Sequence, residues 1–372
     1  MIVPRPSLER RILESLDAGR IPVLLGGCGT GRTSLLLRIE SRLGQSASQY
    51  LDFANAATTP ERCLQTVTDV SRLGSPAVAE PSPRGAFDGL AAFFDSAASA
   101  PSGPGAFLLD EFLDVRTFEN FPGLRHVQRE FVARLAASPT RFVLASRFTS
   151  RVHRLLRDAP ARFEVVHVPP LNAEEVSEVA RLFNGAARTI STDAAALIAS
   201  LTHGRAAYVH LMLDALSGMG PAPDPVAALA ALFAPDGTLT ARCRQSYDLR
   251  LGRARGYGAL KAILGVLADA EPLNLTEISH AMHRTPGSTK DYLSWLEDVD
   301  LISMQRKRYV YDDPVLRLFV RLYGRPVPPT DEDIVREVRG YARSRMPETV
   351  TAPAETAELA SQPDRSGIIE ID

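Results

Sequence analysis

A glycine-rich run between two apolar segments constrains this chain more than any other feature. Residues 26–33 read Gly-Gly-Cys-Gly-Thr-Gly-Arg-Thr, after the apolar residues 21–25 and before the apolar-rich residues 34–43. This is the pattern G-x-x-x-x-G-[KR]-T between a strand and a helix, in which loop N–H groups and the helix N-terminus face phosphates. We expect a nucleoside triphosphate to be held by Gly26, Gly27, Cys28, Gly29, Thr30, Gly31, Arg32, Thr33 and Ser34.

Two side chains of this run carry specific expectations. The hydroxyl of Thr33 is the group that would coordinate Mg²⁺. Arg32 stands where the pattern usually has lysine, so it keeps the charge but replaces a compact ammonium with a planar fork. We therefore expect nucleotide binding to survive this change better than hydrolysis does.

An acid pair downstream supplies the second half of the expected site. The apolar residues 106–109 have strand length and are followed by Asp110 and Glu111. In P-loop enzymes an acid at a strand tip holds the Mg²⁺ shell, and a second acid orients or deprotonates the attacking water. We assign Asp110 to the metal and Glu111 to the water. The alternative is a solvated acidic turn after a core strand, but the coincidence of two motifs favours the site.

Length and composition exclude few classes of function, and the length favours a chain of more than one domain. At 372 residues the chain is too long for one compact core. The net charge of −2 does not indicate binding to nucleic acid or to a membrane. The three cysteines show no paired spacing, which favours a reducing compartment, and no window has the length and apolarity of a membrane span. We expect a cytoplasmic protein that does not bind membranes.

Apolar periodicity divides the chain into five segments. Residues 1–170 alternate strands with helices, which predicts an α/β fold with a parallel five-stranded sheet. The predicted strands are 23–25, 50–53, 107–109, 142–145 and 165–168. Residues 171–253 show only helical periodicity, typical of a helical lid with linker helices. A further helix is expected over 327–345, and 346–372 is rich in Pro, Glu, Ala, Thr and Ser and is expected to be disordered.

Residues 254–326 have a different design. Three predicted helices precede two short strands that flank the basic turn 305–308, and Pro314 begins a last helix. The order helix, helix, helix, hairpin predicts an α+β winged-helix domain.

These motifs, in this order, resemble those of the archaeal-type ATPase family of the STAND class of P-loop NTPases, with this chain as a bacterial member. The resemblance covers residues 4–324 and includes, besides the two motifs above, Ala145-Ser146-Arg147, Pro169-Pro170-Leu171, His203-Gly204-Arg205 and the hairpin end 309–314. It implies an AAA-like ATPase that uses ATP and Mg²⁺ as a switch, in which the nucleotide changes how the lid and the winged helix pack.

Two arginines gain hypothetical roles from the resemblance. Arg147 follows the fourth predicted strand and resembles the first sensor arginine, a catalytic residue that reaches the γ-phosphate; a surface salt bridge is the alternative. Arg205 begins a lid helix, from which it could contact phosphate across the cleft, although arginines at exposed helix starts are common.

The charges of the predicted winged helix argue against DNA as the main partner. Residues 285–300 carry one lysine against four acidic residues, a net charge of −3 on the helix that would read the major groove. The basic groups 306–308 and Arg317, Arg321 and Arg325 leave DNA binding open. We expect a slow ATPase with a protein-docking or regulatory winged helix. An ATP-liganded DNA-binding regulator and a non-hydrolysing scaffold are the alternatives, and an oligomer stays open.

Overall fold

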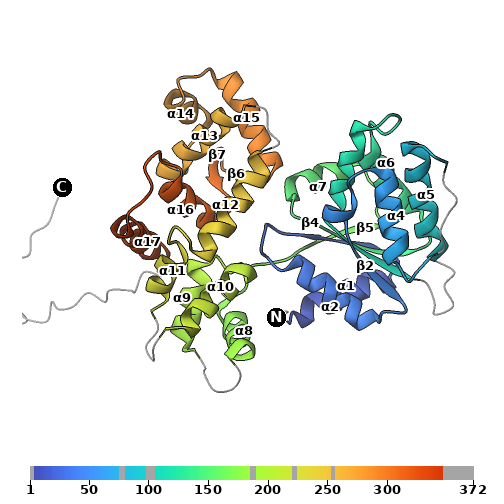
Figure 1. The fold of residues 1–372 in the computed structure, drawn as a ribbon, viewed down its shortest axis with the longest axis horizontal. Helices are drawn as coiled ribbons and strands as arrows, with labels where there is room; N and C mark the ends of the chain where they lie inside the picture. Colours follow the sequence, from blue (N-terminus) through green and yellow to red (C-terminus); the bar gives the residue numbers. More distant parts are fainter. Residues whose placement is uncertain are drawn as a thin grey trace, which may run out of the picture.

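The computed structural model describes residues 4–74, 80–97, 105–184, 190–219, 224–252 and 256–346, so the predicted disordered tail lies outside the described residues from 347 onward. Figure 1 shows an N-terminal α/β domain in blue to green beside a mainly helical C-terminal part in yellow-green to red. In the described part of the chain no helix combines the length and apolarity needed to cross a bilayer.

The α/β domain is built on one parallel sheet with the strand order β2-β3-β4-β1-β5. The strands are β1 (Ile21–Leu25), β2 (Ser48–Asp52), β3 (Ala106–Asp110), β4 (Arg141–Ser146) and β5 (Phe163–His167). This confirms the predicted five-stranded P-loop NTPase sheet. Because the sheet is parallel, its strands run toward one edge, where the residues after β1, β3 and β4 lie near one another.

Helices cover both faces of this sheet, which explains its continuous apolar strands. Leu24 of β1 packs with Ile12 and Leu36 on one face, whereas its neighbours Val23 and Leu25 belong to the core on the other face. The helices are α1 (Pro6–Asp17), α2 (Arg32–Leu43), α3 (Phe53–Ala56), α4 (Pro60–Val70), α5 (Pro83–Ser96), α6 (Val127–Ala137) and α7 (Thr149–Leu156), with the 3-10 helix η2 (Phe112–Asn120) after β3.

The C-terminal part consists of helices and one hairpin. Its helices are α8 (Ala173–Asn184), α9 (Thr192–Leu201), α10 (Ala206–Ser217), α11 (Pro225–Leu232), α12 (Thr238–Leu251), α13 (Tyr257–Ala270), α14 (Leu275–Ala281), α15 (Pro286–Asp298), α16 (Pro314–Tyr323) and α17 (Asp331–Arg345). The hairpin pairs β6 (Ile302–Gln305) with antiparallel β7 (Arg308–Tyr311). Its turn residues Arg306 and Lys307 both have positive φ, as a type I′ turn requires.

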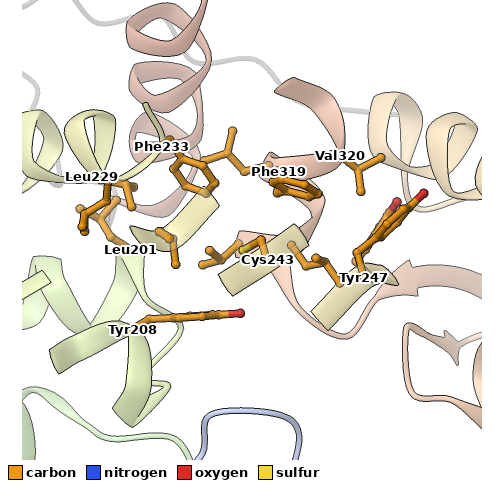
Figure 2. Close-up of a cluster of buried hydrophobic side chains, with 14 of the residues drawn as sticks. Leu201, Tyr208, Leu229, Phe233, Cys243, Tyr247, Phe319 and Val320 are labelled. Carbon is orange, nitrogen blue, oxygen red and sulfur yellow. The ribbon is translucent and has the colours of Figure 1, made fainter. Parts of the chain in front are cut away.

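One hydrophobic cluster runs through this whole C-terminal part. It joins side chains of α9 to α12 with those of α16, among them Leu201, Tyr208, Leu229, Phe233, Cys243, Tyr247, Phe319 and Val320 (Figure 2). At the start of α8 the Asn172 Oδ1 atom accepts from the Glu175 main-chain N–H at 2.8 Å, which caps this helix. Helices α13 to α15 followed by the hairpin reproduce the order of elements predicted for 254–326. The domain boundaries themselves remain predictions.

Candidate functional site

The glycine-rich run forms a loop, the phosphate loop (residues 26–31), that connects β1 to α2. Gly29 and Gly31 have φ values of 81° and 97°, a left-handed region in which side chains are strained. At Gly29 an added Cβ would also lie 3.0 Å from the Ala207 Cβ of α10. Glycine is therefore required here both for the turn and for the close approach of a second element.

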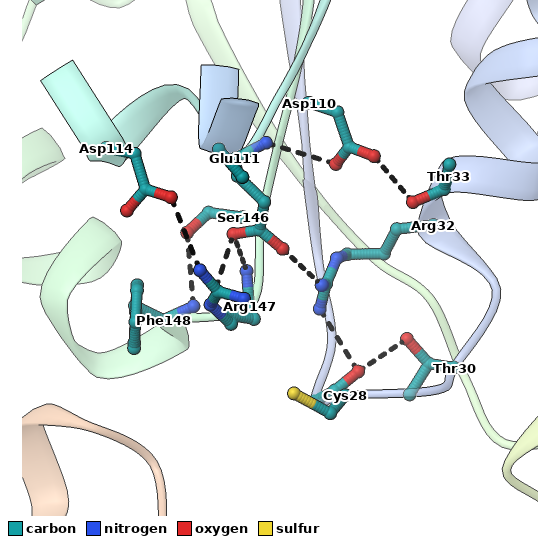
Figure 3. A network of polar contacts seen from close by, with 12 residues as sticks. Cys28, Thr30, Arg32, Thr33, Asp110, Glu111, Asp114, Ser146, Arg147 and Phe148 are labelled. Carbon is teal, nitrogen blue, oxygen red and sulfur yellow. Dashed lines mark hydrogen bonds and ion pairs between the residues drawn. The ribbon is translucent and has the colours of Figure 1, made fainter. Parts of the chain in front are cut away.

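The two predicted Mg²⁺ ligands meet at the end of this loop. The Thr33 hydroxyl donates to the Asp110 Oδ2 atom at 2.5 Å, although the residues lie on α2 and β3 (Figure 3). A hydroxyl and a carboxylate are hard oxygen ligands, and Mg²⁺ is usually held by one or two carboxylates together with phosphate oxygens and water. The described residues contain no group of three or more His, Cys, Asp or Glu that could hold a metal. One hydroxyl and one carboxylate are a ligand set that fits a magnesium ion when phosphate oxygens and water supply the other ligands.

Tyr50 also contacts the carboxylate of Asp110, which the sequence did not reveal. Its hydroxyl donates to the same Oδ2 atom at 3.1 Å. Burial and the nearby negative charge of Asp110 raise the pKa of the Tyr50 phenol above its ordinary range, so the phenol stays a donor. The Glu111 main-chain N–H donates to the other oxygen, Oδ1, at 3.1 Å. These contacts hold the carboxylate of Asp110 in a fixed orientation.

Arg32, in the position of the usual lysine, is bonded to the protein. Its Nη2 atom lies 2.7 Å from the Glu111 Oε1 atom, and its Nη1 atom donates to the Gly27 carbonyl at 3.1 Å (Figure 3). Both Arg32 and Glu111 are buried, and the Arg32 Nε atom has no hydrogen-bond partner among the described residues. The planar guanidinium of Arg32 thus connects the phosphate loop with the acid pair.

The carboxylate of Glu111 is held from both sides. The Arg147 main-chain N–H donates to its Oε2 atom at 3.1 Å, and the guanidinium Nε atom of Arg147 lies 3.7 Å from that oxygen. Arg147 also pairs with Asp114 at 3.3 Å. Burial raises the pKa of Glu111, while the charges of Arg32 and Arg147 oppose that rise. Arg147 therefore lies in the ion-pair network of the acid pair in this structure, and a contact with γ-phosphate remains a prediction.

Arg205 lies against the phosphate loop and is buried, with 6% of its surface exposed. Its Nη1 atom donates to the Cys28 carbonyl at 2.7 Å, and its Nη2 atom donates to the Asp312 carbonyl at 2.9 Å. A Cβ added at Gly27 would lie 2.8 Å from the same Nη1 atom. The guanidinium thus joins the loop to the end of the hairpin, and its predicted phosphate contact remains untested.

Cys28 forms a second link between the loop and the C-terminal part. Its Sγ atom accepts from the Arg250 Nη2 atom at 2.8 Å. Burial favours the neutral thiol, but the charges of Arg250, Arg32 and Arg147 outweigh it and lower the pKa of Cys28. Arg250 also donates to the Asp300 carbonyl at 2.8 Å. No sequence signal marks Arg250, because it lies 222 residues from Cys28 along the chain.

A cavity of about 360 Å³ opens beside the loop and the start of α2. That volume lies within the range of small-ligand sites. Its lining residues are Arg5, Gly29, Thr30, Gly31, Arg32, Thr33, Ser34, Leu35, Ala206, Ala207, His210 and Arg242. The structure thus places six predicted phosphate contacts around one cavity; Gly26, Gly27 and Cys28 belong to the same loop without lining it. Arg5, His210 and Arg242 were not predicted, since nothing in their local sequence resembles a phosphate motif.

Comparisons with known proteins support the fold. A Walker-type ATPase of Pyrococcus abyssi is 17% identical, with a TM-score of 0.65 over 86% of this chain and 96% of that chain. The ORC2 protein of Aeropyrum pernix, solved in ADPNP–ADP complexes, is 14% identical, with a TM-score of 0.52 over 92% of this chain and 96% of that chain. A Pyrococcus horikoshii STAND protein reaches a TM-score of only 0.38, too low to support the STAND assignment.

No protein-family model matches the chain, and no curated protein matches it. The structural likeness nevertheless extends over nearly the whole length of both archaeal proteins. The chain therefore has the fold of the P-loop ATPases.

Proposed function

We propose that this chain is an ATP-binding P-loop ATPase that acts as a slow nucleotide-dependent switch. The single observation that carries the proposal is the contact between Thr33 and Asp110, 2.5 Å apart, directly after the phosphate loop. The loop and Arg32 would hold the phosphates, and Thr33 with Asp110 would hold Mg²⁺. The metal would neutralise the charge that develops on the phosphate oxygens.

Slow turnover follows from the contacts of Glu111. A general base must have an oxygen free to accept a proton from the attacking water. Both carboxylate oxygens are engaged, Oε1 with Arg32 and Oε2 with the Arg147 main chain. Each oxygen keeps a second lone pair that can accept from water, but the two contacts hold the carboxylate in one orientation, and a turn toward the attacking water would weaken them and add to the barrier.

The switch part of the proposal is supported by contacts between the phosphate loop and the C-terminal part. The Cys28 carbonyl accepts from Arg205, the Cys28 thiol accepts from Arg250, and the Gly29 carbonyl accepts from the Ala207 main-chain N–H at 3.0 Å. A ligand that fixes the loop backbone therefore changes the free energy of these contacts. Only such a differential interaction can shift a conformational equilibrium.

We further propose that residues 254–326 are a winged helix used for docking rather than for reading DNA. The acidic end of α15 already contacts the α/β domain, where Asp298 pairs with Arg154 and the Asp300 carboxylate accepts from the Thr149 main-chain N–H at 2.7 Å. A helix with this charge and these contacts is poorly suited to a phosphate backbone. The natural partner would be another protein that competes for, or stabilises, this contact.

Three free cysteines favour a reducing compartment such as the cytoplasm.

Two assays test these proposals. Phosphate release is measured for the wild type and for Glu111→Gln, which keeps the size of the side chain but cannot act as a base; equal rates would exclude catalysis by Glu111. Limited proteolysis of the full chain is then compared with Mg²⁺–ATP and with Mg²⁺–ADP. We expect different cleavage patterns, and identical patterns would contradict the switch.

A further inference from the structure

Helices α11 and α17 lie side by side in the C-terminal part, and an apolar groove runs between them (Figure 1). One wall is formed by Val226 and three alanines of α11, and the other by Ile334, Val335 and Val338 of α17. The groove has a volume of about 340 Å³. That volume is near the lower end of the range for ligand pockets, so the groove suits a short peptide segment rather than a whole helix.

The composition of α11 indicates that something covers this groove. The helix reads Pro-Val-Ala-Ala-Leu-Ala-Ala-Leu and has no polar side chain on any face. A helix that is apolar all round is normally buried on all sides. Ala227 and Ala231 are nevertheless exposed, and Val335 across the groove is 36% exposed. The described part of the chain therefore leaves an apolar face uncovered.

Charged side chains border this apolar face. Asp224, Asp331 and Arg339 also line the groove. Arg343 follows Arg339 by one turn on the same face of α17 and borders the adjoining hollow. Both arginines are exposed, and neither forms an ion pair within the described ranges. The groove therefore adjoins two cations that are available to an acidic partner.

The segment 368–372 of this chain, Ile-Ile-Glu-Ile-Asp, has the composition that such a groove requires. Three of its five residues are isoleucines, whereas the rest of 347–372 contains only two large apolar side chains. In an extended segment Ile369 and Ile371 point to one face, and the two acids point to the other. The isoleucines can therefore enter the groove while the acids stay at its edge, beside the two arginines.

The length of the intervening chain suits this contact. The 22 residues 346–367 separate the segment from the end of α17 at Arg345. A flexible linker of that length has a root-mean-square end-to-end distance of about 25 Å. Helix α17, with 15 residues, is about 22 Å long. A tethered segment has its highest effective concentration when the two lengths match. Residues 347–372 also carry six acidic residues against one arginine, so their charge is opposite to that of the two free arginines.

We propose that residues 368–372 dock in the groove between α11 and α17 of the same molecule. The isoleucines lie against the apolar walls, and Glu370 and Asp372 lie beside Arg339 and Arg343. A protein partner that uses this face of the C-terminal part must then displace the segment. The inference is independent of nucleotide binding, so it stands or falls separately from the proposed function.

The test is fluorescence anisotropy with a labelled peptide of residues 364–372, which is added to the full chain and to a chain shortened after Gly367. The shortened chain should bind the peptide, and the full chain should bind it more weakly because its own segment occupies the groove. A tether supplies an effective concentration of about 1 mM, so a peptide with a Kd of about 0.1 mM for the shortened chain should bind the full chain about ten-fold more weakly.

Charge reversal identifies the groove. In the shortened chain Arg339→Glu should weaken peptide binding by about five-fold, because an exposed ion pair is lost. A peptide with Glu370→Arg and Asp372→Arg should regain part of this affinity with the Arg339→Glu variant. The matched control is Arg181→Glu, since Arg181 is an exposed arginine of α8 that does not line the groove. The control should bind the peptide like the shortened chain, and melting temperatures show that each variant is folded.

Four results would overturn the inference. A folded shortened chain that does not bind the peptide, or that binds a peptide with Ile369→Asp and Ile371→Asp equally well, would exclude the isoleucines as the occupants of the groove. Equal peptide affinities of the full and shortened chains would show that the segment does not occupy its own groove. A full chain that sediments as a dimer, and as a monomer once shortened, would place the segment on a second copy. All four leave the proposed nucleotide binding unaffected.

Discussion

Asp300 offers a sharp test of how the two parts of the molecule are held together. It follows α15, has a left-handed backbone with φ of 50°, and is only 8% exposed. Its carboxylate accepts from the main-chain N–H groups of Thr149 at 2.7 Å and Ser150 at 3.4 Å, which begin α7. A side chain of the C-terminal part thus caps a helix of the α/β domain.

The ionised form of this carboxylate is nevertheless unfavourable in the folded protein. Burial, and then the charge of Asp312, raise the pKa of Asp300 from 3.8 to about 6, although the two N–H groups and Arg250 oppose the rise. Because the folded protein binds this proton more tightly than the unfolded chain does, the contribution of Asp300 to stability is fully present below about pH 4 and is lost as the pH rises through about 6. A pKa difference of about two corresponds to about 3 kcal/mol.

Asp300→Asn keeps an oxygen that can accept both N–H groups but cannot ionise. Relative to the wild type, we expect an unchanged free energy of unfolding near pH 4 and a gain approaching about 3 kcal/mol near pH 7. The assay is urea unfolding at several pH values, monitored by the fluorescence of Trp295 in α15, which is the single tryptophan of the chain. Contributions from other acids cancel in the difference between variant and wild type.

Asp298→Asn is the matched control. Asp298 lies two residues away, and its ion pair with Arg154 is largely solvent-exposed on the arginine side. Exposed pairs contribute about 0–1 kcal/mol, so the free energy of unfolding of this variant should differ from that of the wild type by no more than about 1 kcal/mol. A loss of stability in Asp300→Asn near pH 7, or a difference that does not grow from pH 4 to pH 7, would show that the ionised carboxylate of Asp300 does not destabilise the folded protein.

Three further predictions concern the phosphate loop. Arg32→Met leaves Glu111 buried without its closest cation, so the free energy of unfolding in urea should fall by about 3–5 kcal/mol. A fall of less than about 1 kcal/mol would contradict a structural role for the Arg32–Glu111 pair. Arg32→Lys should raise the rate of phosphate release, because a compact ammonium holds Glu111 less firmly than the fork does, and a lower rate would contradict this view. Cys28 should react with iodoacetamide in the folded protein well before Cys63 does. The reason is that arginine charges lower the pKa of Cys28, whereas burial raises the pKa of Cys63 to about 12. Equal labelling of the two cysteines by mass spectrometry would be inconsistent with a lowered pKa of Cys28.

The phosphate loop and the acid pair could be recognised in the sequence because they obey local rules, and their roles as ligands stay predictions. A glycine-rich run between a strand and a helix, and an acid after an apolar strand, are readable from neighbouring residues. Since parallel strands end at one edge, the meeting of Thr33 with Asp110 also followed from the predicted sheet. The predicted strand ends differ from the observed ones by up to two residues, as Ser48–Asp52 shows against 50–53.

The contacts between the two parts of the chain could not be predicted in this way. Arg205 reaches Cys28 across 177 residues and Arg250 reaches it across 222, and neither distance leaves a periodic or compositional trace. The same holds for Asp300, whose role as the cap of α7 depends on how two domains pack. A lone arginine or aspartate is usually solvated, so only the tertiary structure distinguishes these residues from surface charges.

Nucleotide binding with and without Mg²⁺ shows whether the phosphate loop, Thr33 and Asp110 form a Mg²⁺–ATP site. Equilibrium binding of labelled ATP is measured for the wild type, for Thr33→Ala, and for Thr238→Ala, an exposed threonine that does not line the cavity. We expect Mg²⁺ to tighten ATP binding by the wild type and by Thr238→Ala but not by Thr33→Ala, which lacks the hydroxyl next to Asp110. A folded wild type that retains no ATP at about millimolar concentration, or whose affinity ignores both Mg²⁺ and Thr33, would contradict this expectation.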